Sequence, residues 1–148
     1  PLQNLLVRGI HTTKISALQV NKGLDTGPIY MKKSISIKQG SAEEIFRSIS
    51  SIIFSSMMPK ILQKNIVPKP QRGKAVNFKR RKPSESNILD ASLHTTNEVY
   101  DFIRMLDGEG YPQAFIDVGN KLKITFQSVK KKKETVTGTF TVTKEDYE

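Results

Sequence analysis

Residues 20–37 read VNKGLDTGPIYMKKSISI, and they join two alternating segments through a turn. The segment before the turn, residues 14–21 (KISALQVN), places apolar residues at alternate positions. The segment after it, residues 29–37 (IYMKKSISI), alternates isoleucine with serine at its end. A period of two predicts strands, and the glycines and proline between the segments predict a turn. The stretch therefore predicts two strands that are connected by residues 23–28.

Asp25 lies in the middle of this turn and is the first acidic residue of the chain, since the next is Glu43. An aspartate in a turn most often accepts hydrogen bonds from its own backbone. A carboxylate at the end of a strand in an α/β sheet also lies where ligands tend to bind. Several lysines close in sequence would attract an anionic substrate to it. The residue pattern leaves both interpretations open.

Predicted helices flank the turn and its strands. Residues 1–9 carry leucines at helical spacing and end in glycine. A second helix begins at Ser41, because Ser41 and Glu44 have the spacing of a capping box. Its apolar residues continue at helical spacing as far as Ile61, and we expect Pro59 to kink or divide it. Helices and strands in this order predict an α/β domain.

The second half of the chain changes character. Residues 65–83 contain three prolines and seven positive charges without an acid, which predicts an extended crossing segment in which residues 74–78 (KAVNF) could form a short strand. Beyond it, a helix is predicted over residues 97–110 with its stop at Gly108 or Gly110. Strands are predicted over 113–118, 121–129 and 135–143, with a turn at Gly119-Asn120 and a charged loop at Lys130–Lys133. This half predicts a small β-rich, OB-like domain with one helix.

Composition limits the function. The chain has 148 residues, a net charge of +10 and no cysteine. The charge favours anionic partners such as nucleic acid or phosphorylated metabolites. Without cysteine and with two histidines, disulfides and a metal cluster are not expected, and a reducing compartment fits. No apolar run approaches the roughly 20 residues that span a bilayer, so we expect no membrane contact and a cytoplasmic location.

Several segments, in order, resemble the folate-dependent formyltransferases. Residues 18–37 (LQVNKGLDTGPIYMKKSISI) resemble that family's catalytic region, in which Leu-Asp-x-Gly lies between two strands; here it is Leu24-Asp25-Thr26-Gly27. Residues 70–88 (PQRGKAVNFKRRKPSESNI) follow the family order. Residues 99–116 (VYDFIRMLDGEGYPQAFI) are similar to the start of the C-terminal domain in the methionyl-tRNA and amino-sugar branches. The resemblance covers the chain to about Val129.

This resemblance implies a formyl donor, 10-formyltetrahydrofolate, and a catalytic trio of Asn, His and Asp. Asp25 matches the catalytic aspartate, and Leu24, Thr26 and Gly27 are expected to bind the folate. The family's Asn and His lie upstream of the first helix, and His11 does not occupy that motif position. We therefore expect a fragment that is inactive alone and lacks an N-terminal part of the same polypeptide.

The family order also implies a division into domains. Residues 1–67 would be the C-terminal portion of a formyltransferase-type α/β catalytic domain, 68–80 a basic linker and 81–148 a small C-terminal β-rich domain.

The formyl acceptor is expected to be a primary amine. The absence of tryptophan and the short C-terminal domain favour a nucleotide-linked amino sugar or a similar small amine. Methionyl-tRNA is the alternative, and a non-catalytic basic RNA-binding module is a further one. The expected substrate-binding residues are Lys79, Arg80, Arg81 and Arg104.

Overall fold

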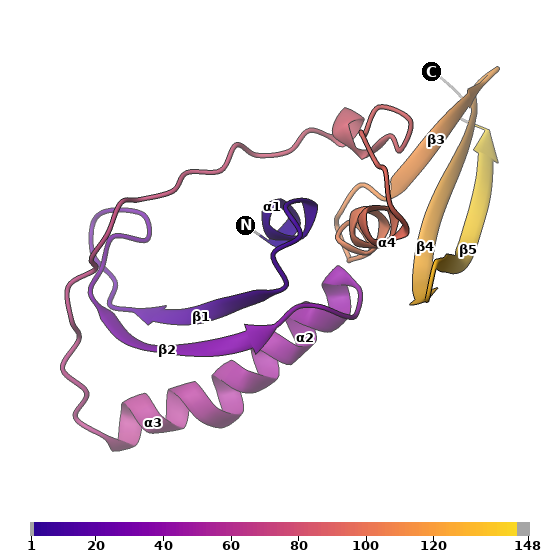
Figure 1. Cartoon of the computed structure of the whole chain (residues 1–148). Coiled ribbons are helices and arrows are strands. Elements are labelled where there is room, and N and C mark those ends of the chain that lie inside the picture. Colours follow the sequence, from indigo (N-terminus) through magenta and orange to yellow (C-terminus); the bar gives the residue numbers. More distant parts are fainter. Residues whose placement is uncertain (1, 145–148) are drawn as a thin grey trace. The chain divides into compact units, whose positions relative to one another are not determined.

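The structure is a computed structural model that describes residues 2–144 (Figure 1). Its elements are the helices and strands α1 (Leu2–Val7), β1 (Thr12–Leu18), β2 (Ile29–Ser36), α2 (Ala42–Ile52), the π-helix η1 (Ile53–Met57), α3 (Met58–Gln63), the 3-10 helix η2 (Pro83–Ser86), α4 (Thr96–Arg104), β3 (Ala114–Gly119), β4 (Leu122–Lys132) and β5 (Thr135–Lys144). The predicted α/β class with a β-rich C-terminal region is confirmed.

The chain divides into two compact units. The hairpin unit consists of His11–Gln39 and Ile45–Asn77. The sheet unit consists of the described residues up to Ile10, Gly40–Glu44 and the described residues from Phe78 onward. The units interleave in sequence because α1 contacts α4, which brings the start of the chain into the sheet unit. The predicted domains, which divide the chain into the consecutive segments 1–67, 68–80 and 81–148, stay a prediction.

The hairpin unit contains the two predicted strands. β1 and β2 pair antiparallel, from Thr12 opposite Ser36 to Leu18 opposite Ile29. Alternate residues of β1 are exposed, so one of its faces is open to solvent. Ile35, Ile37, Ile45 and Met57 are the buried apolar side chains of this unit.

The helix that begins after Ser41 is capped as predicted. Glu44 N donates to Ser41 Oγ at 3.2 Å, and Ser41 N donates to Glu44 Oε2 at 2.8 Å. The predicted division at Pro59 is confirmed, but it takes the form of a π-helix over Ile53–Met57 before the proline. Met58 N donates to Ile53 O, five residues back. Pro59 has no N–H to donate, so one backbone hydrogen bond of the helix is missing there. The wider π-helical turn just before it accommodates this gap in the helical hydrogen bonds.

This helical run bears on the expectation that no segment of the chain is long and apolar enough to span a membrane. Ala42–Gln63 comprises 22 residues, and by length and composition alone it could cross a membrane. The sequence analysis expected no run of this length. A single helix of this kind is weak evidence for a membrane, since core helices of water-soluble proteins meet the same criteria.

The sheet unit is built around α4. Thr95 and Glu98 form a capping box at its start. Its buried face, Phe102 and Ile103, belongs to a core that also contains Leu2, Leu6, Ala42, Met105, Leu106 and Ala114. The predicted helix end at Gly108 or Gly110 is wrong, because α4 ends at Arg104. Leu106 N and Asp107 N then donate to carbonyls three residues back, which tightens the chain into turns.

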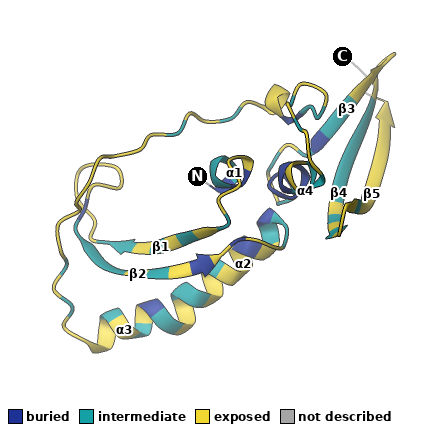
Figure 2. Cartoon of the chain, in the orientation of Figure 1, coloured by how far each residue is buried: buried dark blue, intermediate teal, exposed yellow. Residues whose placement is uncertain are grey.

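Three antiparallel strands complete the sheet unit in the order β3-β4-β5 (Figure 1). The turn predicted at Gly119-Asn120 lies one residue later, because Gly119 ends β3 opposite Leu122 and the turn residues are Asn120 and Lys121, with φ of 51° and 63°. The loop expected at Lys130–Lys133 is wrong, because β4 extends to Lys132 and only Lys133 and Glu134 form the hairpin turn. Figure 2 shows that nearly all of β5 is exposed.

The crossing segment between the units has little regular structure. Residues 74–78, the tentative short strand, are not a strand. The segment bonds to β2 through the backbone, where Ile29 N donates to Lys69 O and Lys69 N donates to Ile29 O. Six of its seven cations are exposed, namely Lys69, Arg72, Lys74, Lys79, Arg80 and Lys82.

Candidate functional site

The turn around Asp25 is stabilised by a neighbour rather than by Asp25 itself. Asn21 Oδ1 accepts hydrogen bonds from Gly23 N at 3.1 Å and from Thr26 Oγ1 at 2.8 Å. Among the described residues, none donates a hydrogen bond to the Asp25 carboxylate or forms an ion pair with it. Asp25 adopts a left-handed backbone with φ of 53° and is exposed. The interpretation that Asp25 caps its own turn is therefore wrong.

The crossing segment holds the turn from outside. Gln71 Nε2 donates to Asp25 O at 2.7 Å and to Gly27 O at 2.8 Å. Both acceptors are backbone carbonyls, so the Asp25 carboxylate stays available. These two hydrogen bonds form a clamp that joins Gln71 to Asp25 and Gly27, which lie 46 and 44 positions earlier in the sequence.

Gly27 has a steric role in the turn. It is buried, and a Cβ added there would lie 1.7 Å from Gln19 O. Gln19 N in turn donates to Pro28 O at 2.8 Å, which closes the base of the loop. Only glycine permits this approach of the two backbone segments. The other two predicted folate-binding residues, Leu24 and Thr26, are exposed in the same turn.

The eight predicted site residues divide between the units. Leu24, Asp25, Thr26 and Gly27 lie together in the hairpin unit, whereas Lys79, Arg80, Arg81 and Arg104 belong to the sheet unit. Lys79 and Arg80 are exposed and accessible to an anion. Arg81 is half-buried, donates to Glu85 O and lies with its guanidinium 5.7 Å from the centre of the Phe102 ring.

Arg104 has a structural environment. Its side chain is 1% exposed and pairs with Asp101 through Nη2 to Oδ1 at 2.6 Å and Nε to Oδ1 at 2.7 Å. Nη1 donates to Gly40 O at 2.8 Å, and the guanidinium lies 5.0 Å from the Tyr100 ring centre. A buried guanidinium with its donors engaged is poorly placed to bind a substrate. We therefore no longer assign Arg104 to substrate binding.

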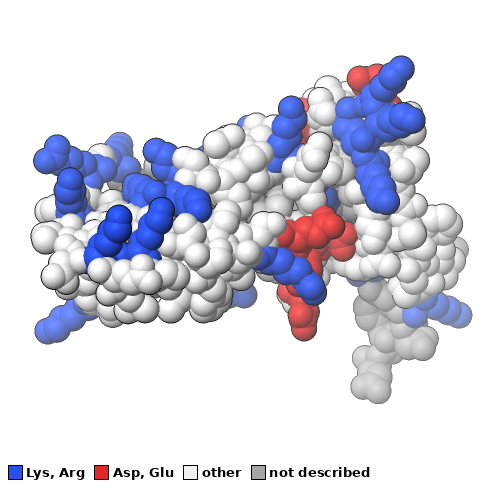
Figure 3. All heavy atoms as spheres, turned by 90° about the horizontal axis from the view of Figure 1, so that it is seen from below, with Lys and Arg blue, Asp and Glu red and all other residues white. Residues whose placement is uncertain are grey.

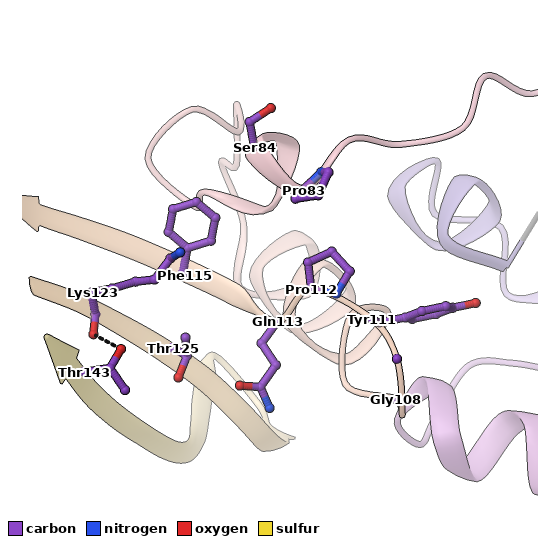
Figure 4. A pocket seen from close by; sticks show the side chains of 11 residues that line it. Pro83, Ser84, Gly108, Tyr111, Pro112, Gln113, Phe115, Lys123, Thr125 and Thr143 are labelled. Carbon is purple, nitrogen blue, oxygen red and sulfur yellow. Dashed lines mark hydrogen bonds between the residues drawn. The ribbon is translucent and has the colours of Figure 1, made fainter. Parts of the chain in front are cut away.

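The sheet unit contains a pocket of about 680 Å³ (Figure 4). It lies among η2, the loop before β3 and the three strands, and is lined by Pro83, Ser84, Gly108, Gly110, Tyr111, Pro112, Gln113, Phe115, Lys123, Thr125 and Thr143. Figure 4 shows Phe115, Lys123 and Thr125 next to one another on the sheet. Lys123 Nζ lies 4.4 Å from the centre of the Phe115 ring. The sequence reasoning did not identify this pocket.

The sequence analysis did not identify Asn21 and Gln71 as residues that hold the turn, and the reasons differ. Asn21 had a local signal, because an asparagine two residues before a glycine is typical of a side-chain-capped turn. Gln71 had none, since its partners are distant in sequence. In the part of the chain that the structure describes, no group of three or more His, Asp or Glu residues is placed to hold a metal ion.

Charge is unevenly distributed on the surface. On the face shown in Figure 3, lysine and arginine side chains are more numerous than acidic ones. This agrees with the net charge of +10. Such a surface attracts a polyanion over a long range at low salt.

Comparison with known proteins identifies the family. Residues 83–143, from η2 into β5, match the family model of the methionyl-tRNA formyltransferase C-terminal domain. A methionyl-tRNA formyltransferase from Halorhodospira halophila is 29% identical over 94 residues, which is 61% of this chain and 30% of that protein.

Solved structures have the same fold. A methionyl-tRNA formyltransferase from Clostridium thermocellum is 44% identical, with a TM-score of 0.88 over 98% of this chain and 62% of that one. HypX from Aquifex aeolicus, solved in complex with tetrahydrofolic acid, has a TM-score of 0.61 at 14% identity over 86% of this chain and 22% of that one. The likeness to HypX concerns the fold alone.

The chain spans less than two thirds of each of these proteins, from 22% of HypX to 62% of the Clostridium thermocellum chain. The family model and the matches to methionyl-tRNA formyltransferases point to the same group of proteins. The chain is therefore similar to the C-terminal part of the methionyl-tRNA formyltransferases.

Proposed function

We propose that the whole protein carrying this chain transfers a formyl group from 10-formyltetrahydrofolate to the amino group of methionyl-tRNA. The observation that carries this proposal is the 44% identity to the Clostridium thermocellum methionyl-tRNA formyltransferase over nearly the whole chain. The match of residues 83–143 to the C-terminal domain of those enzymes supports the same acceptor. The amino sugar favoured by sequence alone becomes the second candidate.

In this proposal Asp25 is the catalytic carboxylate. Gln71 holds the backbone of Asp25, while the Asp25 carboxylate is exposed and has no partner among the described residues. A carboxylate that orients a histidine or accepts a proton through water needs to be accessible in this way. The histidine and an asparagine would come from the rest of the polypeptide. A fixed backbone with a free side chain is the arrangement expected of a residue that contacts groups outside this chain.

Leu24, Thr26 and Gly27 would form the folate-facing wall. Leu24 and the nearby Val20 are 90% and 94% exposed, which is high for apolar side chains. Their surface suits the apolar parts of a pterin ring. When bound, 10-formyltetrahydrofolate supplies the formyl carbon that the acceptor amine attacks. Gly27 keeps the turn compact enough to present this wall.

The basic crossing segment would contact the tRNA backbone. Its six exposed cations follow one extended stretch of chain, from Lys69 to Lys82. Lysine and arginine at such spacing neutralise successive phosphates rather than recognise a small molecule. Lys79 and Arg80, which were predicted as substrate-binding residues, belong to this group.

The test uses the full-length protein with 10-formyltetrahydrofolate and two acceptors, methionyl initiator tRNA and a nucleotide-linked amino sugar. We expect formyl incorporation into the tRNA only. Contacts with six or more phosphates should lower tRNA affinity at least about a thousandfold between about 50 and 200 mM salt. Formylation of the sugar alone would overturn the proposed acceptor. Steep salt-dependent tRNA binding without formylation of either acceptor would favour the non-catalytic RNA-binding module.

A further inference from the structure

The two faces of the three-stranded sheet differ in chemistry. Residues that pair directly across antiparallel strands lie on the same face, and neighbours along a strand alternate between faces. The pairing places a mainly apolar face, here called the apolar face, on one side, consisting of Ala114, Ile116, Leu122, Ile124, Phe126, Lys131, Val136, Phe140, Val142 and Lys144. The opposite side, here called the threonine face, consists of Phe115, Asp117, Lys123, Thr125, Gln127, Lys130, Lys132, Thr135, Thr137, Thr139, Thr141 and Thr143.

A bulge in β4 decides which lysines belong to the threonine face. Gln127 lies opposite Thr139, but the next pair is Lys130 opposite Thr137, so two residues of β4 face one of β5. Ser128 in the bulge has φ of 55°, and its N–H donates to Asp107 Oδ2 at 2.7 Å. Without the bulge, Val129 and Lys131 would occupy these positions. The bulge therefore replaces Val129 and Lys131 by Lys130 and Lys132, which raises the number of lysines at these two positions from one to two.

Both hollows described for the sheet unit open along the threonine face. At one end is the pocket of about 680 Å³, where Phe115 lies between Lys123 and the loop that carries Tyr111 and Pro112. At the other end is a second hollow of about 700 Å³, lined by Lys130, Lys131, Lys132, Lys133, Thr135 and Thr137. The first hollow offers the rings of Tyr111 and Phe115 and the side-chain amide of Gln113. The second offers lysine ammonium groups and threonine hydroxyls.

We infer that the threonine face binds a short stretch of unpaired RNA, with a base in the Phe115 pocket and phosphates at Lys130 and Lys132. This inference deepens the proposed function and rests on its RNA acceptor. A base can stack on a half-buried aromatic ring while the neighbouring lysine contacts its phosphate. The threonine hydroxyls of β5 can donate to phosphate oxygens and exchange hydrogen bonds with ribose 2′-hydroxyls.

The chemistry of the face favours unpaired RNA over a duplex or a protein. In a duplex the bases are stacked on each other, so the Phe115 ring would have no exposed base to contact. A protein partner that buries a core would choose the apolar face, where Phe140 and Val142 are 64% and 52% exposed. Asp117, opposite Lys123, is the one acidic residue among the cross-strand partners of this face.

The dimensions also fit. From Thr135 to Thr143 the strand advances by eight residues, which at about 3.4 Å each is roughly 27 Å. That length is comparable to the shorter binding sites of single-stranded nucleic acid on small β-domains, about four nucleotides. The aromatic pocket and the lysine hollow therefore lie within reach of one oligonucleotide.

The test measures binding of a fluorescent, unstructured octaribonucleotide to the full-length protein by anisotropy. Phe115→Leu should weaken binding about 5- to 150-fold, the loss expected for one base–aromatic stack. Phe140→Leu, a more exposed aromatic on the apolar face, is the matched control and should leave the affinity unchanged. Phe115→Trp keeps a stacking ring and should retain binding, which separates stacking from folding.

The lysines give an independent measurement. The double variant Lys130→Gln/Lys132→Gln should reduce the slope of log affinity against log salt by about 1.4, since each phosphate contact with a single strand contributes about 0.7. Equal effects of Phe115→Leu and Phe140→Leu, or equally tight binding of an abasic octamer, would overturn the inference. Phe115-dependent octamer binding without methionyl-tRNA formylation would instead overturn the proposed function alone.

Discussion

The sheet unit buries a charged pair in its core, whereas the hairpin unit buries only apolar side chains and a glycine. In the sheet unit, Arg104 and Asp101 are enclosed beside Met105 and Leu106. In the hairpin unit the backbone of the candidate catalytic turn is held by two side chains, since Asn21 Oδ1 accepts from Gly23 N and Gln71 Nε2 donates to two carbonyls. Polar groups of the sheet unit thus stabilise the fold, while the carboxylate of the hairpin unit is left available for chemistry.

The largest effect is expected at the buried pair. Arg104→Met should lower the free energy of unfolding of the sheet unit by about 3–5 kcal/mol, because Asp101 remains buried without its partner. Urea denaturation followed by circular dichroism measures it. Arg80→Met, at an exposed cation, should change stability by at most about 0.5 kcal/mol. Replacing both partners, as Arg104→Met/Asp101→Leu, should recover part of the loss. Equal stabilities of the Arg104 and Arg80 variants would contradict a structural role for the pair.

The next effect concerns activity alone. In the full-length protein, Asp25→Asn should lower kcat/KM for formylation by at least about a hundredfold, because the amide cannot accept the proton. Its unfolding curve should match that of the unmodified protein, since no described residue bonds to the carboxylate. Asp90→Asn is the control, because Asp90 accepts a hydrogen bond from Asn87 Nδ2 in the other unit. Unchanged turnover in the Asp25 variant would remove Asp25 from the mechanism.

A smaller effect should affect stability and activity together. Gly27→Ala places a methyl group 1.7 Å from Gln19 O, so the backbone at the base of the turn must move. We expect a loss of about 1–3 kcal/mol in unfolding free energy, with a parallel loss of formylation rate. Gly23→Ala meets mainly the Thr26 side chain, which can rotate, and should cost less. A rate loss in Gly27→Ala without destabilisation would show that the glycine contacts ligand rather than shaping the turn.

The smallest effect is a pH dependence confined to α4. Hydrogen bonds from the backbone N–H groups of His94 and Thr95 lower the pKa of Glu98 from its ordinary value of 4.5. A lowered pKa means that the ionised carboxylate stabilises the fold above pH 4.5 and loses this effect as the pH falls below it. Glu98→Gln should therefore be less stable than the unmodified protein at pH 7, and the difference should shrink toward pH 3. A constant difference across that range would show that ionisation of Glu98 is irrelevant to the cap.

Local signals in the sequence predicted the elements well, because they depend on neighbouring residues. The predicted capping box at Ser41 and the alternating strands need no distant partner to form. The resemblance to the formyltransferases rested on several such contiguous segments taken in order, of which the Leu-Asp-x-Gly turn is one. Element ends were less predictable. The expected stop of α4 at Gly108 or Gly110 and the expected loop at Lys130–Lys133 were wrong, since α4 ends at Arg104 and β4 continues to Lys132.

Three features depended on the tertiary structure. Only the fold shows that Gln71 clamps the Asp25 turn from 46 residues away, because side-chain contacts over such distances leave no local pattern. Only burial shows that Arg104 is a core residue, since an arginine in an amphipathic helix looks like a surface cation in sequence. Likewise the threonine face requires the register of β3, β4 and β5, in which a single bulge decides whether Lys130 or Lys131 joins Phe115. The sequence by itself determined the family, the elements and the charge, while the pairing of strands and the burial of side chains decided which residues are free to act.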